Sequence, residues 1–353
     1  MIGRATTEGK RRVRMTLALV VAAVGLVAGA AYLLREPSDE GVAASAGTLV
    51  PALAGAADRV SLIEISSGTG VVALAKDGDR WVVRSADGYP ADFARIAPLV
   101  QAIASLEKDE PLTAKPERHA ELGLAWPDSS GRAKLVRLRA GDEPPIEVVL
   151  GDARGTPPTT YARLLAENQT WRCKGTAAPE ANPVRYMNPE IVALPADEVR
   201  AVRHLGLVVT RQADPANPTQ PATWVSAVAA GPIESDFWPD AAQTLARNTL
   251  PSWLARLEFD GVRRRGATWT PEPGLTIEYD VDGSTVVVEG MREGEAVWVR
   301  LRAVPRGDAA AGIERWTTWN ASVEPWEYKL PAWKASALTR LREQPKPPAA
   351  PRP

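Results

Sequence analysis

Alternating apolar and polar residues along the body of the chain predict short β-strands. Residues 60–65 (VSLIEI) alternate in this way, and residues 199–204 (VRAVRH) repeat the pattern about 140 positions later. Two β-hairpins are predicted downstream, and the second turns at Asp282-Gly283, a pair typical of tight turns. The matching segments of the two halves are 60–65 and 199–204, 135–139 and 275–281, 146–151 and 285–290, and 161–164 and 298–301. A repeat this long predicts two tandem domains rather than a solenoid.

A helical pattern separates the early strands from the late strands in each half. Apolar residues from Ile96 to Leu106 recur at helical spacing, and Asp92 stands where an N-cap is expected. In the second half a similar apolar stripe extends from Leu250 to Leu257. Strands before and after a single helix favour an antiparallel sheet with the helix on one face.

The predicted fold class is therefore α+β, with two tandem similar modules after an N-terminal transmembrane helix. Each module is expected to be an antiparallel sheet covered by one main amphipathic helix. The predicted divisions are a cytoplasmic basic tail (1–14), a transmembrane helix (15–34), a flexible stalk (35–57), a first α+β module (58–198), a second α+β module (199–343) and a disordered Pro-rich tail (344–353).

The longest apolar run is Met15–Leu34, which has 20 residues and no charged side chain. This length matches the hydrocarbon core of a bilayer, so the run predicts a single-pass signal anchor. Basic residues precede it and acidic residues follow it, which predicts a cytoplasmic N-terminus and an extracytoplasmic body. The alternative is a signal peptide cleaved at Ala28-Gly29-Ala30. Gly25 and Gly29 have the spacing that lets two spanning helices pack closely.

Composition excludes several classes of function. The chain has 42 Lys and Arg against 43 Asp and Glu, a formal net charge of −1, which lacks the basic character of a nucleic-acid-binding protein. Its one cysteine excludes a disulfide framework, a thiolate zinc site and an iron–sulfur cluster. Of the only two histidines, His119 lies in a polar stretch and is interpreted as solvated, and His204 ends a strand pattern; neither is assigned a catalytic role. We expect no metal, no cofactor and no nucleic-acid partner, and the oligomeric state stays open.

No local motif of an enzyme is present. The chain lacks a phosphate-binding G-x-x-x-x-G-K-[ST] loop, a G-x-S-x-G nucleophile elbow and an H-E-x-x-H metal motif. We therefore predict a protein without catalytic residues. A pair of carboxylates that meet only after folding stays open. The basic run Arg263–Arg265 is interpreted as a solvated hairpin, with a contact to an acidic partner or a lipid headgroup as the alternative.

Tryptophan is frequent, and most of it lies in the second half. The chain has 12 tryptophans, and those in strand patterns, such as Trp81, Trp224 and Trp298, favour packing roles. Exposed aromatic side chains bind sugars and partner proteins. Four tryptophans outside any clean alternation form the candidate interaction patch: Trp316, Trp319, Trp326 and Trp333.

The first half also carries an ordered set of residues that is typical of one family. These are Trp81, Pro90, Asp92, Gly123, Leu124, Leu150, Gly151, Tyr161 and Arg163. In this order they resemble the duplicated extracytoplasmic domain encoded beside gliding-motility-type ABC transporter genes in bacteria. The resemblance implies one N-terminal span, a duplicated body and structural rather than catalytic roles for these residues. It is weaker in the second half, where no Leu-Gly-Leu appears and Trp298 replaces the tyrosine.

These features together predict a non-enzymatic accessory protein. It would be anchored in the bacterial inner membrane, hold its body in the periplasm and associate with an ABC permease or another envelope protein. Two alternatives stay open. The first is a freestanding module that binds a glycan or peptide through the Trp-rich second half, and the other is an envelope hydrolase with a carboxylate pair.

Overall fold

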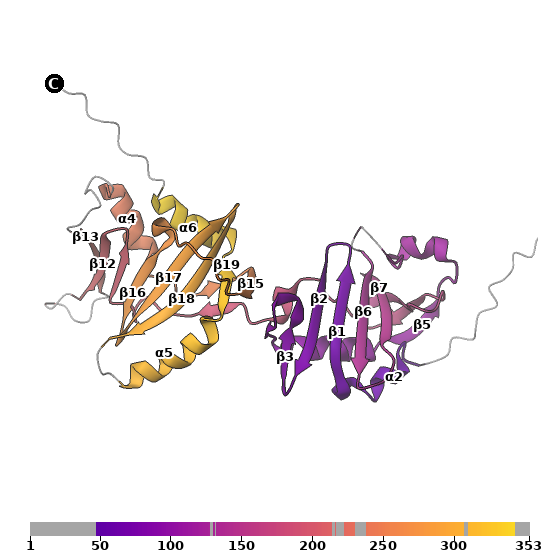
Figure 1. Ribbon diagram of the computed structural model, residues 1–353. Coiled ribbons are helices and arrows are strands. Elements are labelled where there is room, and N and C mark those ends of the chain that lie inside the picture. The colour runs from indigo at the N-terminus through magenta and orange to yellow at the C-terminus, as the bar shows by residue number, and fades with distance from the viewer. Residues whose placement is uncertain are drawn as a thin grey trace, which may run out of the picture.

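Two large antiparallel sheets form the two lobes of the protein (Figure 1). The computed structural model describes residues 47–127, 130, 132–213, 216, 222–229, 238–306 and 310–342. The first sheet contains β1 (Val60–Ser67), β2 (Gly70–Asp77), β3 (Arg80–Val83), β4 (Tyr89–Pro90), β5 (Glu107–Pro111), β6 (Lys134–Ala140), β7 (Ile146–Arg154), β8 (Thr159–Leu164) and β9 (Trp171–Lys174). The second contains β11 (Ala201–His204), β12 (Leu207–Gln212), β13 (Thr223–Val228), β15 (Gly261–Arg264), β16 (Ile277–Val281), β17 (Ser284–Glu293), β18 (Ala296–Pro305) and β19 (Trp326–Lys329). A separate pair joins β10 (Glu190–Val192) to β14 (Leu257–Glu258).

The two sheets share one strand order. The first runs β4-β3-β2-β1-β6-β7-β8-β9-β5, and the second runs β13-β12-β11-β16-β17-β18-β19-β15. Without β4, each strand of the first sheet has a counterpart at the same place in the second. The module limits at 198 and 199 stay a prediction, because β10 lies before this limit yet pairs with β14 beyond it.

Residues that alternate along the strands separate each sheet into a buried and a more open face. On β1, Ile63 and Ile65 are fully buried, and Ile63 lies opposite Leu74 of β2 and Leu138 of β6. On the second sheet, Tyr279 of β16 is fully buried in the same way. The predicted turn at Asp282-Gly283 is confirmed: it connects β16 to β17, and Gly283 has a φ of 68°. The strand pattern therefore places the core where the alternation predicts it.

The helices are α2 (Pro51–Ala54), α3 (Phe93–Ala104), α4 (Asp240–Thr249), α5 (Ala310–Val323) and α6 (Ala332–Arg342), and short 3-10 turns include η1 (Ala57–Arg59), η2 (Arg84–Ala86), η3 (Pro116–Leu122), η4 (Pro183–Tyr186) and η6 (Pro273–Leu275). Helix α3 confirms the first predicted helix. The Asp92 side chain accepts a hydrogen bond from the Ala94 N–H at 3.0 Å, and Ile96 and Ile103 are fully buried. The cap and the apolar stripe are both local features, which explains why the sequence predicts them.

The predicted fold class is wrong. Large antiparallel sheets dominate the described chain, and the modules are not each covered by one main helix. The second lobe has three helices, α4, α5 and α6, against the one expected. Helix α6 was missed because its inward side includes the charged Lys334 beside Ala335 and Leu338, so no simple apolar stripe marks it.

The predicted helix at Leu250–Leu257 is also displaced. Helix α4 ends at Thr249, and the chain then passes through turns into β14. Leu250, Trp253 and Leu254 are nonetheless buried. Pro251 cannot continue the hydrogen-bonding pattern of a helix, so the apolar residues reach the core from turns.

Part of the predicted stalk belongs to the first lobe. Leu49, Val50 and Leu53 are all buried in its core, and the Leu49 N–H donates to the Leu106 carbonyl oxygen at 2.7 Å. Thr48 forms an isolated β-bridge with Glu107. Apolar residues spaced among Ala and Gly therefore pack here, although their composition predicted a flexible linker.

The predicted membrane span is not supported and is corrected. Among the described residues, no helix combines the length and the apolar character that crossing a membrane requires. Met15–Leu34, including Gly25 and Gly29, lies outside the described residues, as does the Pro-rich tail 344–353. The single-pass anchor, the membrane partner and the inner-membrane location depended on this span, so they are not carried forward.

Candidate functional site at the module junction

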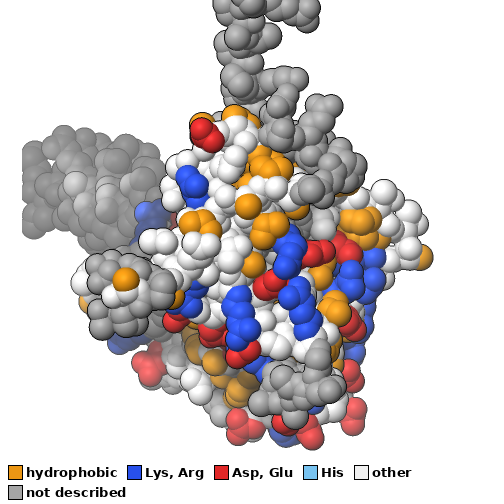
Figure 2. Space-filling view, turned by 90° about the vertical axis from the view of Figure 1, so that its left-hand side faces the viewer, with side chains coloured by type: hydrophobic (Ala, Val, Ile, Leu, Met, Phe, Trp, Pro, Cys, Tyr) orange, Lys and Arg blue, Asp and Glu red, His pale blue; other side chains and the backbone are white. Residues whose placement is uncertain are grey.

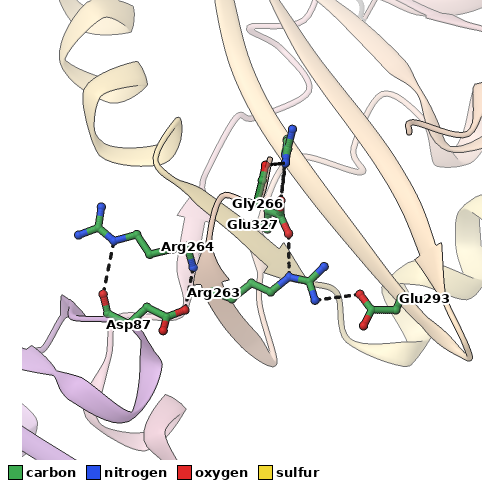
Figure 3. A network of polar contacts seen from close by, with 7 residues as sticks. Asp87, Arg263, Arg264, Gly266, Glu293 and Glu327 are labelled. Carbon is green, nitrogen blue, oxygen red and sulfur yellow. Dashed lines mark hydrogen bonds and ion pairs between the residues drawn. The ribbon is translucent and has the colours of Figure 1, made fainter. Parts of the chain in front are cut away.

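A turn of the first lobe reaches the second lobe at Asp87. Asp87 and Gly88 have φ values of 54° and 80°, and this left-handed turn follows η2 and leads into β4. The Asp87 carboxylate accepts a hydrogen bond from the Arg264 N–H at 3.0 Å, and its carbonyl oxygen accepts one from Arg264 Nε at 3.4 Å (Figure 3). The residues of this contact are 177 positions apart in the sequence.

Tyr89 follows this turn and enters an aromatic box on the second lobe. Its ring centroid lies 4.9 Å from that of Trp326, 5.4 Å from that of Phe259 and 6.3 Å from that of Tyr328, and all three contacts are edge-on. The three box residues are nearly fully buried. Burial raises the pKa of the Tyr89 and Tyr328 hydroxyls, so both stay protonated at neutral pH. Edge-on aromatic pairs add about 0.5–1.5 kcal/mol each beyond area burial.

Main-chain contacts strengthen the junction. The Phe259 N–H donates to the Pro189 carbonyl oxygen at 3.1 Å, and the Leu194 N–H donates to the Leu254 carbonyl oxygen at 2.9 Å. The β10–β14 pair lies between these two bonds. The segment between the two sheets is thus bonded to the second lobe through its main chain, and the Tyr89 ring contacts add a direct contact from the first lobe.

Glu327 is a buried carboxylate next to the aromatic box. Its side chain is 2% exposed, and its oxygens accept from Arg263 Nε at 2.7 Å, Arg300 Nε at 3.1 Å and the Gly266 N–H at 3.0 Å (Figure 3). Arg263 also pairs with Glu293 at 2.8 Å. Burial alone would raise the pKa of Glu327, but the hydrogen bonds from Arg300 and Arg263 hold it below its ordinary value. The carboxylate is therefore charged at neutral pH.

Each arginine of this network also lies over an aromatic ring. The guanidinium carbon of Arg263 is 4.0 Å from the Trp298 ring centroid, and that of Arg264 is 4.3 Å from the Trp326 centroid. Arg300 lies 4.2 Å from the Trp269 centroid. The interpretation of Arg263–Arg265 as a solvated hairpin is therefore wrong for Arg263, which is partly buried and ion-paired, whereas Arg264 is exposed but contacts Trp326 and Asp87. Only Arg265 has an exposed side chain without a contact among the described residues.

The first lobe has a neutral residue where Glu327 lies. Trp171 pairs with Ala162 of β8 on the first sheet, and Tyr328 pairs with Val299 of β18, the matching strand of the second sheet. Thr170, which precedes Trp171, therefore corresponds to Glu327, which precedes Tyr328. The buried Thr170 hydroxyl donates to the Thr113 carbonyl oxygen at 2.8 Å. The charged network thus belongs to the lobe that receives the Asp87 turn.

Sequence reasoning missed Asp87, Tyr89 and Glu327. The alternation places Glu327 on the face of β19 opposite to Trp326 and Tyr328, where a charged side chain is expected to be solvated, yet the structure buries it there. A charge at such a position needs partners of opposite charge. Nothing local indicated which arginines these would be.

The residues of the family pattern have structural places in the first lobe. Trp81 on β3 is 9% exposed, Pro90 closes the sheet edge in β4, and Asp92 caps α3. Leu150 lies on the opposite face of β7 in the main core. The other five meet where η3 covers the open face of the sheet: Gly123, Leu124, Gly151, Tyr161 and Arg163.

Arg163 shows how this region is held without a carboxylate. It is 5% exposed, and its guanidinium donates to the carbonyl oxygens of Leu124 at 3.2 Å and Leu165 at 3.0 Å. Burial lowers its pKa, but an arginine stays charged at neutral pH. Its counterpart in the second lobe, Arg300, has the Glu327 carboxylate as its partner instead.

The four tryptophans of the candidate patch do not share one exposed surface. Trp316 and Trp326 are 3% and 5% exposed, and Trp319 donates from Nε1 to the Ile191 carbonyl oxygen at 3.1 Å. Only Trp333, on α6, is largely exposed, at 65%. Seen from the end of the molecule that carries the second lobe, basic side chains lie beside acidic ones and hydrophobic atoms are scattered (Figure 2).

The histidines and the cysteine are buried, so the interpretation of His119 as solvated is wrong. His119 Nε2 lies 2.9 Å from the Asn168 carbonyl oxygen. Cys173 is fully buried, and burial raises the pKa of its thiol to about 12. His204 is 2% exposed, with Nδ1 2.9 Å from the Thr276 carbonyl oxygen and no partner for Nε2 among the described residues. It lines a cavity of about 510 Å³ with Arg203 and Glu278.

Unfolding should become easier in mild acid because of His204. Burial lowers its pKa, so below the ordinary value of about 6.5 the unfolded chain binds a proton that the folded chain does not. His204 therefore leaves the free energy of unfolding unchanged above this pH. Below it, His204 lowers the free energy of unfolding by up to about 1.4 kcal/mol per pH unit. Urea unfolding from about pH 7.5 to pH 5 measures this slope. In His204→Gln, the free energy of unfolding should fall less steeply with decreasing pH, by that amount. An unchanged slope would contradict the lowered pKa of His204 in the folded protein.

Comparison with known proteins identifies one family. A family model described as "Domain of unknown function (DUF4340)" matches residues 81–276. The match begins at Trp81 and ends at Thr276, so it includes both the Asp87 turn and Arg264. No curated protein and no solved structure matches the chain.

Proposed function

The chain belongs to the family described as "Domain of unknown function (DUF4340)", and from this premise we propose that it is a non-enzymatic accessory protein that docks on a larger protein assembly. An ABC-type transport complex is the proposed partner, because the sequence resembles a family encoded beside such transporter genes. The protein would act by holding two similar modules in one relative placement.

The junction is the observation that carries this proposal. Asp87 and Tyr89 of the first lobe are engaged by Arg264, Phe259 and Trp326 of the second. Two similar sheets in a fixed placement present two surfaces that a single partner engages together. Simultaneous engagement raises the apparent affinity by orders of magnitude without any new contact, provided that the geometry fits.

The buried titratable groups favour a binding protein over an enzyme. Asp280 is held by Arg203 at 2.6 Å and by Arg306, and Glu327 is held by Arg263 and Arg300. Burial would raise the pKa of Asp280, but these hydrogen bonds keep it below its ordinary value. Carboxylates that stay charged are poor proton donors, unlike the general acid of a hydrolase. The burial of Trp316 and Trp326 likewise argues against a broad tryptophan surface for glycans.

The proposal is tested by recovering the partners of the full-length chain. The chain is crosslinked in its native cells, purified under mild conditions and analysed by mass spectrometry. We expect an ABC permease and its ATPase in stoichiometric amounts. Recovery of the chain alone, despite efficient crosslinking, would overturn the proposal.

Junction variants test whether docking depends on the fixed placement. The double variant Tyr89→Ala, Arg264→Ala should recover at least about tenfold less partner. Once one module has bound, the other is then no longer held close to its site on the partner, so its effective concentration there falls. Arg265→Ala is the matched control, since Arg265 neighbours Arg264 but has no side-chain contact among the described residues. Circular dichroism checks that each variant is folded. Equal recovery by the double variant would contradict the role of the junction.

A further inference from the structure

A groove of about 340 Å³ lies on the first lobe and shares no lining residue with the junction network. It is formed where α3 passes β2, β3 and η1. Its apolar lining includes Trp81, Ile96 and Val100, which are 9%, 0% and 6% exposed. The volume suits one or two large apolar side chains rather than a whole helix.

Phe93 projects beside this groove. It is 60% exposed, although it is the first residue of α3 and lines the groove itself. Its backbone position is well defined, because Asp92 caps the helix and also pairs with Arg95 at 3.2 Å. An exposed aromatic side chain on a fixed backbone is typical of an interface anchor.

The groove carries one charge of each sign. Asp58 and Lys76 both line it, both are exposed, and neither has an ion-pair partner among the described residues. A surface that contains both a projection and a cavity, and both an acid and a base, has the elements that pairing with a second copy of itself requires. Self-complementarity is the requirement for a two-fold interface, in which each contact occurs twice.

We propose that this surface pairs two copies of the chain, with Phe93 of each copy in the groove of the other. Asp58 of one copy then faces Lys76 of its partner, and the reverse pair forms across the two-fold axis. The charges favour a second copy over a partner that presents only acidic or only basic residues. Such a partner would leave either Asp58 or Lys76 without an opposite charge. This pairing does not depend on the proposed docking partner.

Sedimentation equilibrium of the full-length chain tests the pairing, over concentrations from about 1 µM to about 1 mM. We expect a monomer–dimer equilibrium whose dissociation constant rises at least tenfold in Phe93→Ser. Val71→Ser is the matched control, because Val71 is 59% exposed on β2 yet does not line the groove. It should leave the equilibrium unchanged. A monomer at every concentration, or a dimer that persists in Phe93→Ser, would overturn the proposal.

Charge exchange separates this interface from general hydrophobic association. Asp58→Lys should weaken the dimer because two lysines then face each other, and Asp58→Lys, Lys76→Asp should restore it. Both residues are exposed, so thermal unfolding should show intact folding. If the double exchange does not restore pairing, the proposed orientation is wrong. If the chain stays monomeric and a different protein crosslinks to position 93, the occupant is that protein and the proposal fails.

Discussion

Glu327→Ala is expected to lower the free energy of unfolding by about 3–5 kcal/mol. The Glu327 carboxylate is 2% exposed and is the shared partner of Arg263 and Arg300. Its removal leaves the Arg300 side chain, which is 10% exposed, with a buried and uncompensated charge. Urea unfolding followed by tryptophan fluorescence measures the change.

Glu289→Ala is the matched control on the same sheet. Glu289 pairs with Arg302 at 3.0 Å, but the Arg302 side chain is 49% exposed and remains solvated without its partner. The expected loss is below about 1 kcal/mol. Similar losses in the two variants would show that burial does not decide the strength of the Glu327 network.

The stabilisation by Glu327 also has a pH dependence of known sign. Its pKa is lowered on folding, so the stabilisation is present above the pKa of the unfolded chain, about 4.3. It is lost as the pH falls through the lower pKa of the folded protein. This window lies below that of His204, so the two contributions are separable by pH.

Gly151→Ala is expected to destabilise the first lobe by about 2–3 kcal/mol. A Cβ at this position of β7 would lie 2.4 Å from the Leu122 carbonyl oxygen and 2.9 Å from that of Gly123. Both obstacles are backbone atoms, so the η3 turn has to move away from the sheet. The change in denaturant midpoint of urea unfolding measures the effect.

Gly290 on β17 and Gly55 after α2 provide the comparisons. A Cβ at Gly290 would lie 2.6 Å from Leu275 Cβ and 2.9 Å from its carbonyl oxygen, so Gly290→Ala should have a loss of similar size in the second lobe. At Gly55 a Cβ would meet nothing within 4 Å, and the φ of this residue is −104°, so Gly55→Ala should be nearly neutral. A neutral Gly151→Ala would contradict the close approach of η3 to the sheet.

The close approach explains part of the family pattern in physical terms. Gly123 ends η3 with a φ of 67°, and Gly151 lets the backbone of that turn lie against β7. In the second lobe, η6 approaches Gly290 in the same way, with Gly274-Leu275 in place of the Leu-Gly-Leu of the first half. Gly151 and Gly290 thus meet a packing requirement that both sheets share.

Several elements follow from the sequence because their causes are local. The alternation of residues 60–65, the turn at Asp282-Gly283, and helix α3 with its Asp92 cap all depend on neighbours a few positions apart. Local burial patterns also identified Leu250, Trp253 and Leu254 as core residues, although not their conformation. Steric contacts and hydrogen bonds between residues a few positions apart depend little on the rest of the fold. The sequence alone therefore predicts the elements that they determine.

The tertiary structure alone decided which polar residues meet. Arg264 is 177 positions from Asp87, and Arg263 is 64 positions from Glu327, so neither pair has a sequence spacing that marks it. Their meeting depends on β15 pairing with β19 at one register and on the first lobe presenting its turn there. The same register buries Trp326 and brings Arg263, from a basic run that resembled a solvated hairpin, into the ion network of Glu327. Sheet order sets which distant strands become neighbours, and the alternation within each strand is compatible with many such orders.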